Sequence, residues 1–403
     1  MCPRRLGVRS RLLTCLAMSL GLLLGACASN PVSVPPTLLD DAQFAPAAEP
    51  IDPADVFRPS AAMKEYLENE VLPAARASGG IRQALTAQLY NKGKLKLEYE
   101  SSMTRNASQA FDARSGNCLS LVIMTAALAQ ELGIKVTFQS IGTDEMWSRA
   151  GDMYFLSGHV NLQLEKHASE MESRYDRYGT YTIDFLPSEN SVGLNATIIR
   201  ENRVLAMYLN NRAAEALVRG QVDDAYWRVR EAIRQDPAFL SAFNTLGVVY
   251  LHHGDPRRAE AVLAFVSKQE KDNPRVLANY AQALRELGRT DEASAIQQRL
   301  AHLEPYPPFY FFNRGRAALN EGKLAEARQD FMRELDRAPD YHEFHYWLAI
   351  ADFGLGRIDE ARKELNLAMQ DAVKRSDHDL YAAKLDYLKG YMQHPAVPSG
   401  ASQ

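Results

Sequence analysis

The stretch Gly220-Gln-Val-Asp-Asp-Ala225 returns four more times, with its glycine and alanine kept, at a constant interval of 34 residues. The glycines of the five copies are Gly220, Gly254, Gly288, Gly322 and Gly356. The alanines that follow them are Ala225, Ala259, Ala293, Ala327 and Ala361. A third column, ahead of each glycine, is also small: Ala213, Gly247, Ala281, Gly315 and Ala349. We expect each copy to be a pair of helices, with the glycine at the turn and the small residues where the helices cross closely.

This interval is the period of the tetratricopeptide repeat, and residues 206–375 resemble five such repeats. Residues 376–403 are expected to form a helix that caps the open end, followed by a tail. Glu334 and Asp352 occupy positions that are often apolar in this repeat, and we expect them to weaken their helices. The resemblance implies an all-α solenoid whose surface binds a protein or peptide partner.

The N-terminus has the pattern of a secretory signal, with a basic segment followed by an apolar run from Leu12 to Leu24. The run ends in Leu24-Gly-Ala-Cys27, which resembles the lipobox of bacterial lipoproteins. The resemblance implies that residues 1–26 are a signal peptide and that acyl chains on Cys27 hold the protein to the membrane. Because Ala28 follows rather than an aspartate, it implies the outer membrane, facing the periplasm. The alternative is an ordinary signal peptide with a cysteine at this place by chance.

Residues 27–59 are rich in proline and poor in large apolar residues. They are therefore expected to form an extended tether between the lipidated Cys27 and the folded body. Two of the four cysteines, Cys2 and Cys15, fall within the signal peptide. Cys118 is then the one free thiol expected in the mature chain, without a partner for a disulfide.

Residues 60–200 have a mixed pattern. Helical spacing dominates first, and an apolar stretch that starts at Cys118 ends at Gly133, a residue typical of a helix C-terminus. Three runs with β-like composition follow, at residues 136–141, 159–164 and 180–185. Helices followed by antiparallel strands predict an α+β domain.

Three residues of this domain form a chemically coherent set. Cys118 begins a predicted helix, whose N-terminus favours a thiolate over a thiol. His159 begins a strand, and Asp184 lies at the end of the next one. Thiol acyl transfer needs such a set, because the thiolate attacks a carbonyl, the imidazole protonates the leaving group and the carboxylate orients the imidazole. A buried core cysteine and a structural histidine are the alternative interpretation.

The same residues resemble the transglutaminase-like superfamily. The matching segments are Arg114-Ser-Gly-Asn-Cys118, Gly158-His-Val-Asn161 and Asp184-Phe-Leu-Pro187. The resemblance covers residues 60–200 and implies a papain-type α+β fold with Cys118, His159 and Asp184 as the catalytic triad. Many relatives have an aromatic residue soon after the histidine, where this chain has Val160-Asn-Leu162. The backbone amide of Cys118 is the one oxyanion donor that we expect.

Composition narrows the remaining function classes. A net charge of -4 argues against a nucleic-acid surface, which needs a basic face. The sequence contains no zinc-type cysteine and histidine cluster and no glycine-rich phosphate loop, so no metal or cofactor is expected. It does not predict an oligomeric state. Two functions stay open: a thiol-dependent hydrolase or acyltransferase with a partner-binding array, and a non-catalytic adaptor lipoprotein that acts through its repeats.

Overall fold

The computed structural model describes residues 35–78, 80–90, 95–100, 103–150, 153–165, 180–185, 195–372 and 375–393. The predicted signal peptide and the predicted lipidation site Cys27 lie outside these residues. Within them, no helix is both long enough and apolar enough to cross a bilayer.

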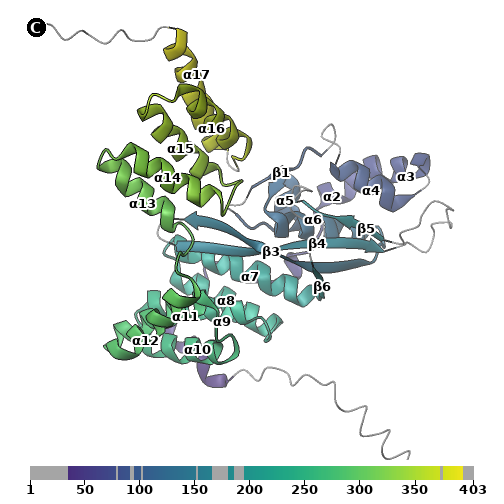
Figure 1. Cartoon of the computed structure of the whole chain (residues 1–403). Coiled ribbons are helices and arrows are strands. Elements are labelled where there is room, and N and C mark those ends of the chain that lie inside the picture. The colour runs from purple at the N-terminus through teal and green to yellow at the C-terminus, as the bar shows by residue number, and fades with distance from the viewer. Residues whose placement is uncertain are drawn as a thin grey trace, which may run out of the picture.

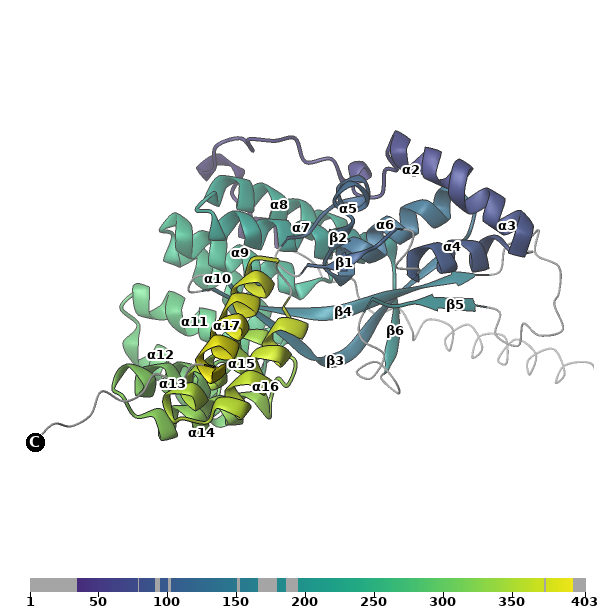
Figure 2. The same cartoon turned by 90° about the horizontal axis from the view of Figure 1, so that it is seen from above.

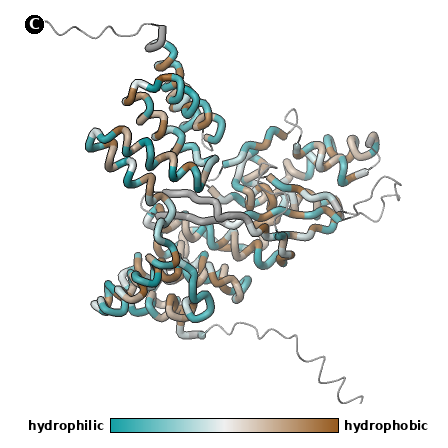
Figure 3. Tube along the Cα trace, viewed as in Figure 1, coloured by the Kyte–Doolittle hydropathy of each residue, from teal (hydrophilic) through white to brown (hydrophobic). Residues whose placement is uncertain are grey.

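A mixed helical and β region comes first along the chain (Figure 1). Its helices are α2 (Ala61–Tyr66), which continues through a π-helical turn (Leu67–Val71) into α3 (Leu72–Ser78), α4 (Ile81–Tyr90), α5 (Ala107–Ala113) and α6 (Cys118–Glu131). Helix α6 is apolar on all sides, and every residue from Cys118 to Ala129 is buried. A helix of this kind must lie in the middle of a core. Figure 3 shows apolar residues concentrated where α6, the sheet and α7 meet.

The sheet is antiparallel and has the order β5-β4-β3-β6 in the described residues. Its strands are β3 (Val136–Ala150), β4 (Met153–Glu165), β5 (Thr180–Ile183) and β6 (Ala196–Ile199). The first two are longer than the sequence predicted and form a hairpin, in which Ile141 pairs with His159. A separate short parallel pair joins β1 (Glu98–Tyr99) to β2 (Ser115–Gly116), just ahead of α6.

The C-terminal half consists of helix pairs, as the glycine columns predict. The helices are α7 (Glu201–Val218), α8 (Val222–Gln235), α9 (Leu240–His253), α10 (Pro256–Gln269), α11 (Pro274–Glu286), α12 (Thr290–Leu303), α13 (Tyr310–Asn320), α14 (Leu324–Leu335), α15 (His342–Gly354), α16 (Ile358–Gln370) and α17 (Arg375–Gln393). Gly254, at the turn between α9 and α10, has a φ of 84°, a left-handed conformation that favours glycine. A Cβ on Gly315 would lie 2.8 Å from the Phe331 ring, so close crossing explains the small residue.

The array is interrupted between its third and fourth helix pairs. Elsewhere in the array, the second helix of one repeat packs against the first helix of the next. Helices α12 and α13 share no comparable contact. The core that includes α6 ends at Ala283, and a separate core begins at Phe309. Figure 1 shows α13 to α17 as a group apart from α7 to α12, whereas the two groups overlap in the view from above in Figure 2. The 34-residue spacing continues through this break, so the glycine columns do not indicate it.

Two acidic residues that we expected to weaken the array instead connect its helices. Glu334 is fully buried and accepts a hydrogen bond from the backbone N–H of Phe312 at 2.9 Å. Asp352 accepts from Nε of Arg328 at 2.6 Å. Buried carboxylates with such partners are satisfied, so neither residue leaves an unpaired charge inside the array.

The predicted tether is packed rather than free over residues 35–59. We call this segment the N-terminal strap. Phe44 is buried, and its ring stacks on Tyr226 of α8 at a centroid distance of 3.8 Å. The hydroxyl of Tyr250 donates to the carbonyl of Leu38 at 2.9 Å. The strap then joins the first region, where the Ala107 N–H donates to the carbonyl of Val56 at 2.9 Å. The strap has few large apolar residues, so aromatic residues of α8 and α9 provide most of the apolar surface against which it packs.

Replacing Phe44 tests whether the strap is part of the fold. We expect Phe44→Ala to lower the free energy of unfolding by about 3 kcal/mol, because the variant loses a buried ring and leaves a cavity beside Tyr226. Urea denaturation followed by tryptophan fluorescence measures the change. The neighbouring exposed Gln43→Ala is the control, with an expected change below about 0.5 kcal/mol. Equal stability of the two variants would contradict the packed strap.

Candidate functional site

Cys118 is the first residue of α6, and the residues around it explain why a helix begins there. The side chain of Asn117 caps the helix by accepting from the backbone N–H of Ser120 at 2.9 Å. A Cβ on Gly116 would lie 2.6 Å from Cβ of Ser120, so only glycine fits in the Ser-Gly-Asn-Cys segment. The amide of a residue in the first helical turn has no partner within the helix. The Cys118 side chain therefore lies at a helix end that carries partial positive charge.

His159 lies on β4 and is completely buried. Its Nε2 lies 2.7 Å from Oδ1 of Asp184, which follows β5 directly. Its other ring nitrogen, Nδ1, has no hydrogen-bonding nitrogen or oxygen partner among the described residues. The pKa of His159 is raised to about 9: burial lowers it, but the hydrogen bond to Asp184 and the contact with the Cys118 side chain raise it more. The structure thus brings all three predicted residues together.

Asp184 is held by two residues that the sequence analysis missed. The Nδ2 of Asn161 donates to its second carboxylate oxygen, Oδ2, at 2.9 Å. The hydroxyl of Tyr90, at the end of α4, accepts from the backbone N–H of Asp184 at 2.9 Å and donates to its carbonyl at 2.8 Å. Asn161 lies two residues after His159 and so on the same face of β4, a spacing that could have indicated it. Nothing in the sequence around Tyr90 points to Asp184.

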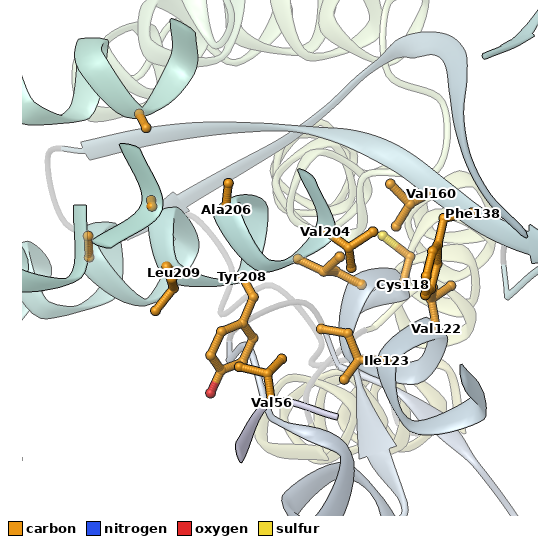
Figure 4. Close-up of a cluster of buried hydrophobic side chains, with 14 of the residues drawn as sticks. Val56, Cys118, Val122, Ile123, Phe138, Val160, Val204, Ala206, Tyr208 and Leu209 are labelled. Atoms are coloured by element: carbon orange, nitrogen blue, oxygen red, sulfur yellow. The ribbon is translucent and has the colours of Figure 1, made fainter. Parts of the chain in front are cut away.

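The Cys118 sulfur lies in an apolar environment. The residue is only 3% exposed, and Figure 4 shows its side chain close to Val160 of β4 and Val204 of α7. Phe138 of β3 lies beside it in the same view. The first helix of the repeat array therefore forms part of the wall around the thiol.

Metal ligation finds no support in the described part of the chain, where no group of three or more histidine, cysteine or acidic residues could hold an ion. His345, on α15, is buried. It hydrogen-bonds to Glu364 and to the carbonyl of Pro339, each at 2.7 Å. The Glu364 carboxylate and the Pro339 carbonyl thus occupy both ring nitrogens, so this histidine has a structural role.

Comparisons with known proteins bear on the array. Tetratricopeptide repeat families match residues 250–306 and residues 312–376. The C-terminal half carries tetratricopeptide repeats. The two matches meet at the interruption between α12 and α13. These repeats typically mediate protein–protein interaction. A search of curated proteins gave no match.

Several solved structures are also similar to part of this chain. PilF of Pseudomonas aeruginosa is 21% identical over 49% of this chain and 96% of its own, with a TM-score of 0.27. A tetratricopeptide repeat protein of Thermus thermophilus is 19% identical over 45% of this chain and 98% of its own, with a TM-score of 0.28. YrrB, described as having an unusual peptide-binding site, is 20% identical over 45% and 92%, with a TM-score of 0.24.

The raised pKa of His159 predicts a pH dependence of stability. The folded value of about 9 exceeds the ordinary value of 6.5, so protonated His159 stabilises the fold fully below pH 6.5. This contribution is lost as the pH rises through 9. Between these limits we expect the free energy of unfolding to fall by up to about 3 kcal/mol. Urea denaturation at several pH values measures this slope.

The Asp184→Asn variant isolates the cause of that slope. It keeps the shape of the side chain but removes the carboxylate charge that favours imidazolium, so its stability should fall much less with rising pH. A variant with the same slope as the wild-type protein would show that Asp184 does not hold the proton on His159.

Proposed function

We propose that the protein is an envelope lipoprotein in which Cys118, His159 and Asp184 carry out thiol-dependent acyl transfer or amide hydrolysis, and whose repeats bind a protein or peptide partner. The observation that supports it most is the 2.7 Å contact between His159 and Asp184. This contact uses one ring nitrogen and leaves the other for the Cys118 side chain, which contacts the ring. A transglutaminase-like fold for residues 60–200 is part of the proposal, supported by the helix at Cys118 and the adjacent antiparallel strands.

The chemistry follows from the three side chains. The Cys118 thiolate forms a bond to the carbonyl carbon of an amide, and the carbonyl electron pair moves to oxygen. His159, as imidazolium, gives its proton to the leaving amine when the C–N bond breaks, which leaves a thioester. Asp184 keeps the imidazole in one orientation during both transfers. Water then releases an acid, or a second amine forms a new amide, and the thiol is restored.

Anchoring to the outer membrane through Cys27 belongs to the same proposal. Pro35, where the described strap begins, is eight positions after Cys27, and an extended chain of that length spans about 26 Å. The beginning of the strap lies against α8 and α10, because Arg258 of α10 pairs with Asp40 and the Tyr226 hydroxyl of α8 donates to Asp41. An anchor at Cys27 would therefore hold the first two repeats close to the membrane.

A second candidate function is the non-catalytic adaptor. The specific observation in its favour is the burial of the Cys118 sulfur, which a substrate carbonyl must reach. In addition, the families that match this chain are both tetratricopeptide repeats, which typically mediate protein–protein interaction. In the adaptor, the His159 and Asp184 pair would be a structural feature of the core.

The rate of Cys118 alkylation by iodoacetamide at pH 7 separates the two functions. The suitable protein lacks residues 1–26 and has serine in place of Cys27, so Cys118 is its one thiol. We expect alkylation to be about 100-fold slower in His159→Ala, because the imidazole no longer stabilises the thiolate.

A matched control uses the other buried histidine with a carboxylate partner. His345→Ala removes the same side chain from the repeat array, far along the chain from Cys118, and should leave the alkylation rate unchanged. Equal rates for wild-type protein and His159→Ala would reject the enzyme and favour the adaptor.

A further inference from the structure

The N-terminal strap is held largely through its backbone, in the way that a bound peptide is held. Tyr226 of α8 accepts from the Asp40 N–H at 3.0 Å, and the indole of Trp227 donates to the carbonyl of Ala45 at 2.6 Å. Four more hydrogen bonds of this kind join Arg258 to the Thr37 carbonyl, Tyr250 to the Leu38 carbonyl, Asp223 to the Ala45 N–H and Asp224 to the Ala48 N–H. Contacts of this kind fix the path of an extended chain without reading its side chains.

Two kinds of side-chain contact add selectivity to this backbone recognition. The buried ring of Phe44 stacks on Tyr226 and also lies 4.4 Å from the ring of His253. Asp41 accepts from the Tyr226 hydroxyl at 2.7 Å and from Nε of Arg230 at 2.8 Å. Asp40, the residue before it, pairs with Arg258. The surface thus selects two adjacent acidic residues with an aromatic ring three positions after the second.

The strap has few of the contacts that fix a segment of a core. Among the described side chains of residues 35–49, those that are buried are Leu38 and Phe44. The ion pair of Asp41 with Arg230 is partly exposed, and such pairs stabilise weakly. The surface beneath the strap is instead composed of tyrosine, tryptophan and arginine, the residue types that dominate binding sites. A free chain that makes the same contacts can therefore replace the strap.

We propose that the surface formed by Tyr226, Trp227, Arg230, Tyr250 and Arg258 is a peptide-binding site that the strap of the same chain occupies. Its partner is an extended segment of another protein that has two adjacent acidic residues and an aromatic residue three positions later. This inference rests on the proposed partner-binding role of the repeats and gives that role a site and a partner chemistry. The strap competes with the partner, so only molecules with a released strap bind it.

A synthetic peptide with the sequence of residues 35–49, labelled with fluorescein, probes the site directly. It is titrated with the mature protein that has serine in place of Cys27, and binding is read by fluorescence anisotropy. We expect the Phe44→Ala protein to bind this peptide about 10-fold more tightly than wild type, because its own strap is released in a larger fraction of molecules. Asp41→Asn weakens the strap at an exposed carboxylate, which leaves the fold intact, and should tighten binding about threefold.

Variants of the receptor surface locate the bound peptide. Adding Tyr226→Phe to the Phe44→Ala protein keeps the ring but removes the hydroxyl that holds Asp40 and Asp41, and should weaken peptide binding about fivefold. Adding Tyr280→Phe instead is the matched control, because the hydroxyl of Tyr280 on α11 hydrogen-bonds to Glu260. It should leave the affinity unchanged.

Three results would overturn the proposal. The first is absence of peptide binding to both weakened-strap proteins. The second is equal affinity of wild type and these proteins, which would place the peptide elsewhere. The third is a wild-type dimer in size-exclusion chromatography that Phe44→Ala abolishes, which would assign the site to the strap of a second copy. Failure of the proposed chemistry looks different, because His159→Ala would then alkylate as fast as wild type whatever the peptide does.

Discussion

Burial of α6 on all its sides is the constraint on which the rest of the first region depends. A helix with no polar face can exist in water only if other elements cover it completely. The sheet, α2 and α7 all contact it. Its N-terminus is therefore held in one place, and so is Cys118, the first residue of the helix. Strand β4 packs against α6 and carries His159, and its neighbour β5 leads directly into Asp184, so the packing that hides the helix also assembles the three side chains.

The same core extends into the repeats. Val204 of α7 lies close to Cys118, and one continuous set of buried side chains runs from the N-terminal strap to Ala283. The strap contributes by crossing from α8 and α9 to α5, where the carbonyl of its Val56 accepts a hydrogen bond from the Ala107 N–H. The first repeats are thus built into the region that holds the thiol, whereas α13 to α17 form a separate unit.

The sequence predicted features that depend on local spacing or composition. The glycine columns predicted the repeats, and the order of Cys118, His159 and Asp184 predicted residues that the fold brings together. The sequence did not reveal contacts between residues far apart along the chain. Phe44 was hidden because its partner Tyr226 is 182 positions away. Tyr90 was missed for the same reason, because its partner Asp184 is 94 positions away, and the break between α12 and α13 leaves the spacing of the glycines unchanged.

The proposed chemistry requires a histidine that carries a proton beside Cys118 at neutral pH. Nitrogen-15 NMR of the His159 ring at pH 7 tests this most directly, with the signal assigned by its loss in His159→Gln. Because the pKa of His159 is raised to about 9, both ring nitrogens should be protonated. A neutral ring at pH 7, with a proton on one nitrogen alone, would contradict the account.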